Sequence, residues 1–402
     1  MVPTRWGGLA ARAYFLVSSR LAERADEATY ASNSFNGVKA LQGWYDGSTG
    51  LWDTTGWWNS ANCLTVLADW ALLDQSDSNT LGVFSIMQNT FLNAQSTAAT
   101  AVKTISATGM ISSTYTFATT ASKRAEMAAN GFSGFINNYY DDEGWWALAW
   151  IRSWDVSNDP GFLDMAEHIF EDMKAGTDST CGGGIWWSKD RNYKNAIANE
   201  LYLSVAASLA NRVPSNKAYY LSIAESQWTW FRNSGMINSN NLINDGLTIQ
   251  SNGQCVNNGD NTWSYNQGVI LGGLVELYKA TGDSSYLTEA ATIATAAIAL
   301  LSSSSTGVIH ESGGCEPNCG ADGSQFKGIF VRNLHYLQEV APQDAFRNSI
   351  FRNADSIWAN DRNGNNQFGI SWAGPASAGG GPNASTHSSA MDVLVAAMAA
   401  AA

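Results

Sequence analysis

The strongest constraint on the fold is a repeated pairing of helical patterns along the chain. In each pair an amphipathic segment precedes a segment that is more uniformly apolar and rich in Ala, Gly, Leu and Val. A helix that is apolar all round is buried on every side. The pattern therefore predicts an all-α (α/α)6 barrel, a toroid of six helical hairpins with the apolar helices inside. The pairs cover 34–46 with 60–75, 81–98 with 145–156, 161–176 with 194–213, 216–235 with 265–282, 284–302 with 325–340, and 346–360 with 385–401.

Two features of the chain set limits on this domain. Strand signals are weak, and the region around 100–135 is a polar, Ser- and Thr-rich insertion between helical segments. The alternative to a barrel is two unrelated helical bundles, but no Pro- or Ser-rich linker divides the chain near its middle. We therefore expect a single domain over residues 35–402, preceded by an N-terminal extension over 1–34 that forms a peripheral helix or a tail.

Charge and aromatic content narrow the class of ligand. The chain has 402 residues, 17 of them Trp, and a formal net charge of −13. An acidic protein cannot neutralise a phosphate backbone, which argues against nucleic acid as a partner. No segment reaches the roughly 20 apolar residues that a membrane-spanning helix needs. A neutral ligand rich in hydroxyl groups, such as a glycan, is more compatible with so many aromatic rings.

The cysteines and histidines do not indicate a metal site. None of the five cysteines forms a CxxC pair, and the four histidines are scattered. Cys315 lies in a Gly-rich loop, where a disulfide to Cys319 or to Cys255 is compatible with the sequence, and the odd total leaves at least one thiol unpaired. Cys63 lies in an apolar segment and is expected to be a buried free thiol. We expect no metal and no cofactor.

The loops that enter the inner helices share one character. Each combines aromatic residues with polar amides immediately before the helix begins. In a closed barrel these loops meet at one end, so we expect them to line a single groove suited to a linear polysaccharide. The loops are 56–62, 137–146, 182–200, 261–268 and 321–328.

The segment NNYYDDEGWWALAW, residues 137–150, places Asp141 and Asp142 side by side among five large rings. Like charges repel, and apolar surroundings raise the cost of ionising a carboxyl group. Hydrolysis of a glycosidic bond uses two carboxyl groups with different protonation states. Because neighbours on a helix diverge by about 100°, the pair is expected on an irregular turn, before a helix that begins near Trp145. The alternative is that Asp142 caps that helix and Asp141 is its solvated neighbour.

Several motifs resemble glycoside hydrolase family 76, the endo-α-1,6-mannanases. They are YYDDEGWWALAWI, GWWNSANCLTVLADW, CGGGIWWS, NAIANELYLSVAASL, WSYNQGVILGGLVELY and FKGIFVRNL, and the similarity extends from about residue 35 to the C-terminus. The resemblance implies a barrel fold and a retaining enzyme that cleaves α-1,6-mannan internally. It also implies that Asp141 is the nucleophile and Asp142 the acid/base, and that a fungal-type member is secreted or associated with the cell wall. The first 30 residues do not resemble a signal peptide, since four arginines interrupt their apolar runs.

Further residues of these loops are candidates for binding mannan or mannose-containing oligosaccharides. The alternative for the rings is core packing, for the amides helix capping, and for Lys327 a solvated position. Asp245 and Asp260 are weaker candidates for a sugar hydroxyl. The candidates are Trp57, Trp58, Asn59, Asn62, Tyr139, Tyr140, Trp186, Trp187, Asn199, Glu200, Tyr265, Asn266, Gln267 and Lys327.

Three other functions are compatible with the same residues. A cell-wall transglycosidase would use both aspartates to transfer a mannose-containing anchor glycan onto wall polysaccharide. A non-catalytic glycan-binding protein would use only the aromatic groove, and a structural scaffold would bind no saccharide. We expect a monomer.

Overall fold

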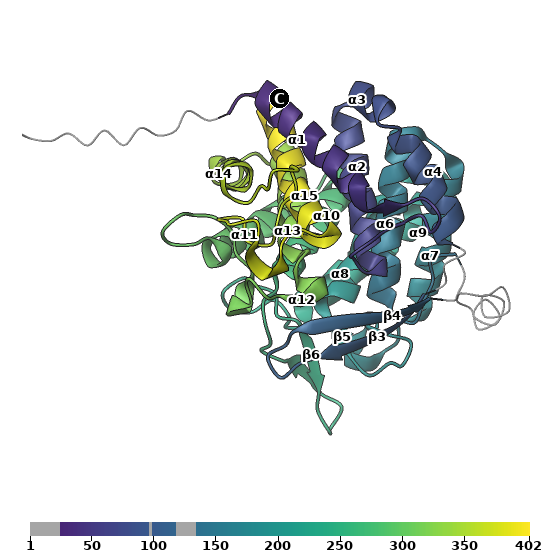
Figure 1. Cartoon of the computed structure of the whole chain (residues 1–402). Coiled ribbons are helices and arrows are strands. Elements are labelled where there is room, and N and C mark those ends of the chain that lie inside the picture. The colour runs from purple at the N-terminus through teal and green to yellow at the C-terminus, as the bar shows by residue number, and fades with distance from the viewer. Residues whose placement is uncertain (1–24, 96–98, 118–133) are drawn as a thin grey trace, which may run out of the picture.

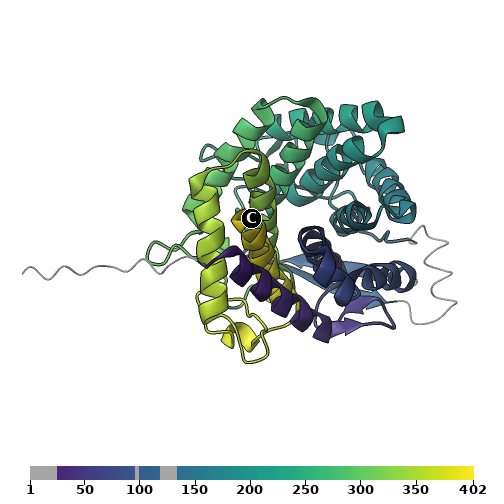
Figure 2. The same cartoon turned by 90° about the horizontal axis from the view of Figure 1, so that it is seen from above.

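The computed structural model describes residues 25–95, 99–117 and 134–402, and its central feature is a closed ring of helices. Each inner helix packs against the next in chain order, and the last packs against the first. Figure 2 shows these helices and an outer layer arranged around a common axis. Within the described residues the inner helices are α2 (Trp57–Leu73), α6 (Tyr140–Ser157), α8 (Ala196–Arg212), α10 (Ser264–Thr281), α13 (Phe326–Val340) and α15 (Ala384–Ala401).

The outer layer alternates with the inner ring along the chain, so the predicted (α/α)6 architecture and all six predicted pairs are confirmed. A short helix, α3 (Gln75–Thr80), leads from α2 into the outer layer, and another, α12 (Gly320–Gly323), precedes α13. The outer helices are α1 (Glu27–Leu41), α4 (Val83–Ala94), α7 (Pro160–Ala175), α9 (Lys217–Asn233), α11 (Ser285–Leu301) and α14 (Asp344–Asn360).

Helix α7 illustrates why the outer helices form where they do. Asp159 caps it by accepting a hydrogen bond from the backbone N–H of Gly161, and Pro160 occupies the first turn, where a missing N–H costs nothing. Its buried residues, Phe162, Ala166, Ile169, Phe170 and Met173, recur at helical spacing on one face. The inner helix α8, by contrast, is buried on nearly every side, as its composition predicts.

The expected boundary at residue 34 is not a structural one. Helix α1 begins at Glu27, after the Asp26 carboxylate caps it by accepting from the Thr29 N–H at 2.8 Å. It continues without a break to Leu41 and packs against α15. Residues 27–34 therefore belong to the barrel. Residues 1–24 of the expected extension lie outside the described residues.

The described residues also form short strands in the segments between the helices. The longest pair is the antiparallel hairpin of β3 (Ala99–Ile105) and β4 (Ile111–Phe117), in the region expected to be only a polar insertion. The rest of that insertion, 118–133, lies outside the described residues. The other strands are β1 (Tyr45–Asp46) with β2 (Leu51–Trp52), and a three-stranded sheet of β5 (Lys194–Asn195), β6 (Gly246–Ile249) and β7 (Cys255–Asn257).

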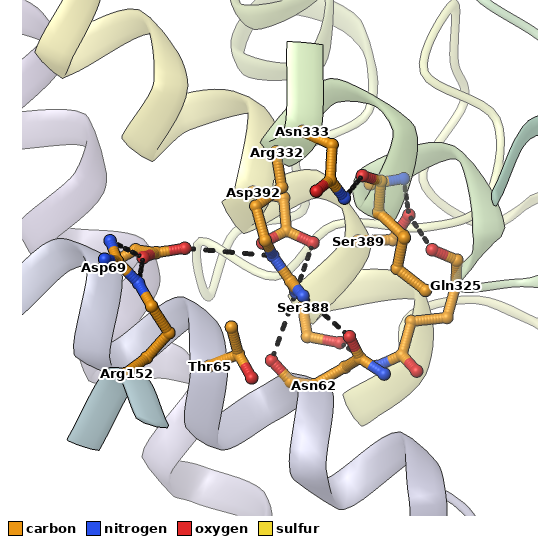
Figure 3. A network of polar contacts seen from close by, with 12 residues as sticks. Asn62, Thr65, Asp69, Arg152, Gln325, Arg332, Asn333, Ser388, Ser389 and Asp392 are labelled. Atoms are coloured by element: carbon orange, nitrogen blue, oxygen red, sulfur yellow. Dashed lines mark hydrogen bonds and ion pairs between the residues drawn. The ribbon is translucent and has the colours of Figure 1, made fainter. Parts of the chain in front are cut away.

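A buried polar network ties the inner helices together (Figure 3). Arg332 of α13 donates to both carboxylate oxygens of Asp392 in α15, each at 2.8 Å, and to the Asn62 Oδ1 atom of α2 at 2.7 Å. Asp69 of α2 pairs with Arg152 of α6. These contacts fix α2, α6, α13 and α15 relative to one another. Each buried charge of the network lies next to a side chain of opposite charge.

The cysteines agree with one of the two pairings that the sequence allows for Cys315. Cys315 is bonded to Cys319, Cys181 is bonded to Cys255, and Cys63 is a buried free thiol as expected. No helix of the described residues is both long and apolar enough to span a bilayer.

Candidate active site

The predicted site residues gather at the end of the barrel where the inner helices begin. Trp57 and Tyr140 are the first residues of α2 and α6, and Ser264 is the first residue of α10. The β3–β4 hairpin runs across this end of the barrel (Figure 1). The loops preceding the inner helices therefore meet at one end, under a cover that the sequence did not suggest.

Asp141 and Asp142 lie in the first turn of α6 and not on an irregular turn before it. The expectation that the helix begins near Trp145 is wrong, because α6 begins at Tyr140. The two side chains nevertheless converge. Side chains of a helix tilt toward its N-terminus, so carboxylates in the first turn can both extend beyond the end of the helix. The partial positive charge of the helix N-terminus also favours carboxylates at this position.

The point on which they converge is the ammonium group of Lys103, in strand β3. Lys103 Nζ lies 2.7 Å from Asp141 Oδ2 and 2.6 Å from Asp142 Oδ1. Because the two distances add up to 5.3 Å, these two carboxylate oxygens are no more than about 5.3 Å apart. Retaining glycosidases hold their two carboxyl groups about 5–5.5 Å apart, whereas inverting enzymes need about 6.5–9.5 Å. This upper limit is shorter than the separation that an inverting enzyme needs, and it is compatible with a retaining enzyme.

Further hydrogen bonds distinguish the two aspartates. Asp142 Oδ2 accepts from the Asn137 amide at 2.7 Å and from the Tyr115 hydroxyl of β4 at 3.1 Å. Asp141 Oδ1 has no hydrogen-bond partner among the described residues. Asp142 is fully buried, and Asp141 is 5% exposed. One carboxylate is thus held by fixed donors, and the other keeps an oxygen available.

Burial raises the pKa of Asp142 to about 6, with a further increase from the charge of Asp141. The Lys103 ammonium opposes this shift, as do the hydrogen bonds from Lys103 and Asn137. Burial alone would lower the pKa of Lys103, but the Asp141 and Asp142 carboxylates outweigh it and raise that pKa above its usual value. A carboxyl group with a pKa near 6 can carry a proton or release it near neutral pH.

Glu143, the next residue, is a third buried acid that the sequence analysis did not single out. It accepts from the Asn137 backbone N–H at 3.2 Å and pairs with Lys189 at 3.2 Å. Burial raises its pKa well above the usual range. These contacts tie Glu143 to the segment that carries Asn137 and to Lys189.

The predicted aromatic residues divide into two groups. Tyr139 and Trp187 face the site, since Lys103 Nζ lies 4.9 Å and 5.7 Å from the centres of their rings. Trp58 donates from Nε1 to Asp322 at 2.8 Å, and the Asp322 carboxylate interacts with the charges of Lys103 and Asp141. The Tyr265 ring stacks on the Phe326 ring, with 3.9 Å between the ring centres. Trp57, Tyr140 and Trp186 have packing partners instead: Trp57 packs on Trp146, Tyr140 lies against Gly176, and Trp186 donates to Asp178.

Most of the predicted polar residues have structural partners. Asn59 bonds with Gln325, Asn62 accepts from Arg332, and Lys327 is not solvated, since it pairs with Glu316 at 2.6 Å and donates to the Ile370 carbonyl. The side chains of Asn199 and Gln267 bond to the backbone of Ile185 and Ile243 respectively. These contacts position the loops of the groove and occupy the groups that were expected to meet a sugar.

Glu200 and Asn266 differ from these residues. Both are fully buried, and neither carboxylate oxygen of Glu200 nor either amide atom of Asn266 has a hydrogen-bond partner among the described residues. Burial raises the pKa of Glu200 well above its usual value, with an added effect of Asp245. Asp245 accepts from Tyr193 at 2.6 Å, and burial raises its pKa to about 6. These unused polar groups are candidates for binding hydroxyl groups.

An open groove lies at the loop that precedes α10. It encloses about 540 Å³ and is lined by polar residues that include Asn244, Asp260, Asn261, His310 and Glu311. The weaker candidate Asp260 is therefore placed in an accessible, hydroxyl-compatible depression. Asp245, by contrast, is buried.

Sequence reasoning missed the residues that contact the aspartates from the hairpin. Lys103 and Tyr115 lie in a region without helical periodicity, and nothing local connects them to residues 141 and 142. Alternation within 99–105 and 111–117 was the available signal, because it places Ala101, Lys103 and Tyr115 on one face of the hairpin. Lys194 was also missed; it is buried and donates to Asp178 and to the carbonyl oxygens of Thr180, Gly183 and Gly184.

Curated proteins resemble this chain in sequence over about half its length. Mannan endo-1,6-alpha-mannosidase DFG5 of Candida albicans is 32% identical over 219 residues, which cover 50% of this chain and 47% of that protein. The protein of the same name from Saccharomyces cerevisiae is 33% identical over 219 residues, covering 50% and 46%. The chain thus spans about half the length of the curated relatives it matches.

Solved structures share the fold over most of the chain. An inactive variant of the α-1,6-mannanase GH76A of Salegentibacter sp. HEL1_6, with two neighbouring aspartates replaced and α-1,6-mannotriose bound, superposes with a TM-score of 0.72. It is 21% identical, and the match covers 92% of this chain and 99% of that one. Dfg5 from Chaetomium thermophilum in complex with glucosamine gives a TM-score of 0.71 at 18% identity, covering 97% and 92%.

The family assignment depends on a match along almost the whole chain. The model of glycosyl hydrolase family 76 matches residues 20–402, which includes every helix described above. The chain belongs to glycosyl hydrolase family 76.

Proposed function

We propose that the protein is a retaining glycosidase that cleaves α-1,6-mannosidic bonds within mannan chains. The observation that carries this proposal is the convergence of Asp141 and Asp142 on one point, with two of their oxygens closer together than an inverting enzyme needs. The family membership and the α-1,6-mannotriose bound by the structural relative support the choice of linkage.

In this proposal Asp141 is the nucleophile. Its Oδ atom attacks the anomeric carbon and forms a covalent glycosyl ester while the bond to the leaving oxygen breaks. Asp142, whose pKa is raised to about 6, gives its proton to that oxygen. Asp142 then takes a proton from water, the hydroxide attacks the anomeric carbon, and the ester bond to Asp141 breaks.

The surroundings supply groups suited to a sugar. The rings of Tyr139 and Trp187 lie beside Lys103 and the aspartates, and Trp58 bonds to the neighbouring Asp322. Glu200 and Asn266 offer buried polar atoms without partners among the described residues, and a buried polar group is ordinarily hydrogen-bonded. We propose that sugar hydroxyls complete these hydrogen bonds, and that neighbouring sugars extend into the groove beside α10.

We also propose that the protein acts outside the cytoplasm, secreted or at the cell wall. The Cys181–Cys255 and Cys315–Cys319 disulfides support this proposal, because such bonds persist in oxidising compartments. Fractionation of cells that express the full chain, followed by immunodetection in wall and medium, tests the location.

The activity is tested by incubating the purified protein with unbranched α-1,6-mannan and separating the products by chromatography. We expect a ladder of short oligosaccharides whose newly formed ends first have the α configuration, as retention requires. Products with an inverted configuration, or no products at all, would overturn the proposal. A parallel reaction with an excess of acceptor glycan detects transglycosylation, which would appear as products longer than the donor.

A further inference from the structure

The β3–β4 hairpin, residues 99–117, lies over the aspartates, and we refer to it as the strap. Its register pairs Val102 with Thr114 and Lys103 with Ser113. Alternate residues face opposite sides of a strand, so Lys103 and Tyr115 face the barrel while Val102, Thr104 and Thr114 face solvent. One face of the strap is thus built for contact with the site.

The strap is attached to the barrel at three places along its length. Near its base, the Asn138 side chain bonds with both the backbone N–H and the carbonyl of Ala101, at 2.9 and 2.7 Å. At its centre, Lys103 and Tyr115 bind the aspartate pair. At its tip, the Asn261 side chain donates to the Thr108 carbonyl at 2.9 Å, from the loop before α10.

These contacts leave no room for a substrate at the reacting position. In a retaining enzyme the anomeric carbon lies between the two carboxyl groups. Lys103 Nζ already occupies that position, at 2.7 Å or less from an oxygen of each aspartate. Lys103 is itself 9% exposed, Asp141 5% and Asp142 not at all, so a mannan chain cannot reach the pair while the strap is in place.

We propose that the strap is a movable cover, that Lys103 holds it closed by acting as the counter-ion of both aspartates, and that it must lift to admit substrate. This inference rests on the proposed function, since it assumes that the glycan reacts between Asp141 and Asp142. In the closed state the ammonium group stands where positive charge develops on the sugar during the reaction. Lifting the strap therefore removes a cation from the carboxylates, and the positive charge that develops on the sugar in the transition state takes its place.

The tip contact allows a direct test by a reversible cross-link. A Cβ atom built on Gly109 lies 4.0 Å from the Asn261 Cβ atom, within the range of about 3.5–4.5 Å typical of disulfides. The double variant Gly109→Cys/Asn261→Cys should therefore lock the strap when it is oxidised. Gly109 has a φ of +75°, which a cysteine tolerates poorly, so the single variant Gly109→Cys is needed to measure the effect of that change alone.

We expect the oxidised double variant to hydrolyse α-1,6-mannan at least about tenfold more slowly than the same protein after reduction, because closure of a lid controls access. The single variants Gly109→Cys and Asn261→Cys should not respond to reductant, which controls for the two native disulfides. A cross-linked protein, verified by mass spectrometry, that keeps the rate of its reduced form would overturn the proposal. An inactive wild-type protein would instead refute the proposed function.

A second measurement needs no substrate. A water-soluble carbodiimide with an amine modifies accessible carboxyl groups, and mass spectrometry locates the products. Removing one partner of a buried ion pair destabilises the state in which the other partner stays buried. Lys103→Met should therefore destabilise the closed strap and accelerate modification of the 137–150 peptide by about tenfold or more. Lys39→Met, at an exposed position on α1, is the matched control. Equal rates in Lys103→Met and wild type would show that Lys103 does not hold the strap closed.

Discussion

Lys103 Nζ lies 2.7 Å from Asp141 Oδ2, although the two residues are 38 positions apart in the sequence. The contact joins a strand outside the helical ring to the first turn of an inner helix. It places a cation at the position that the anomeric carbon occupies in the proposed reaction. The contact therefore affects both the protonation of the two aspartates and the access of substrate to them.

The pH dependence should report this contact. Asp142 must be protonated to act as an acid, and its pKa is about 6, so kcat/KM for α-1,6-mannan should fall as pH rises through about 6. The charged and titratable groups facing Asp142 are Lys103, Asp141 and Tyr115. Lys103→Met removes the cation that lowers this pKa, so the alkaline limb of kcat/KM should move to higher pH.

The alkaline limb of the pH profile of kcat should lie at a different pH from that of kcat/KM. The ratio kcat/KM reports groups of the free enzyme, and kcat reports those of the complex. If Lys103 leaves the pair when substrate binds, the limb of kcat should already lie at higher pH in the wild type and move less in Lys103→Met. Equal displacement of both limbs would mean that the ammonium group stays in place during turnover.

Variants of the two aspartates should differ in the kind of activity that each retains. Asp141→Asn should lose hydrolysis of every substrate, because no covalent intermediate can form. Asp142→Asn should lose about 10²–10⁴-fold on mannan, yet keep much of its first step on an aryl mannoside, whose leaving group needs no proton. Both variants should still bind mannotriose, as isothermal titration calorimetry would show, and lost binding would indicate a structural role.

Glu200 should influence stability in a pH-dependent manner. Its pKa in the folded protein is well above the unfolded value of about 4.3, so the folded state retains a proton that the unfolded chain releases. Stability should therefore fall as pH rises above about 4.3. Glu200→Gln removes this effect and should melt at a higher temperature than wild type at pH 8, with a smaller difference at pH 5. The control Glu225→Gln, exposed on α9, should match wild type at both values.

The network between α13 and α15 should be sensitive to single changes and tolerant of a paired one. Arg332→Met leaves the buried Asp392 carboxylate without its cation, which typically costs about 3–5 kcal/mol. Arg332→Met/Asp392→Leu replaces both charges and should recover most of the lost stability in urea denaturation. If the double variant is as unstable as the single one, the network contributes through packing and not through charge pairing.

The disulfides should differ in their contribution because they close loops of different length. Cys181 and Cys255 are separated by 74 positions, and Cys315 and Cys319 by 4. Loop-closure entropy predicts losses of about 4 and about 2 kcal/mol when each pair is replaced by serine. Thermal melting of the two double variants would test the order, and a larger loss for the short loop would indicate that its local contacts dominate.

The helical architecture could be predicted because its signal is local and repeated. Each outer helix has an apolar stripe and each inner helix is more uniformly apolar, as α7 and α8 illustrate. The strap could not be predicted in the same way. Its strands mix Thr and Ser with scattered large apolar residues, and the face toward the site carries Lys103 in place of a continuous apolar row.

The candidate site was partly predictable for a similar reason. Two adjacent acids among aromatic rings are unusual in composition, so Asp141 and Asp142 could be selected from the sequence. Whether a loop amide meets a ligand or the backbone depends on neighbours distant in sequence. Asn199 bonds to Ile185 and Gln267 to Ile243, whereas Asn266, next to Gln267, has no partner among the described residues.

The closed ring has a consequence for how the chain acquires its shape during synthesis. Contact between α15 and α2 completes the circle, and α15 begins only at Ala384. Until that segment leaves the ribosome, one flank of α2 and one flank of α13 remain without their neighbour, and Arg332 remains without Asp392. During most of its translation the nascent chain is therefore an incomplete ring with uncovered helix surfaces. It depends on α15, or on a chaperone that covers the same surfaces, to avoid association with other chains.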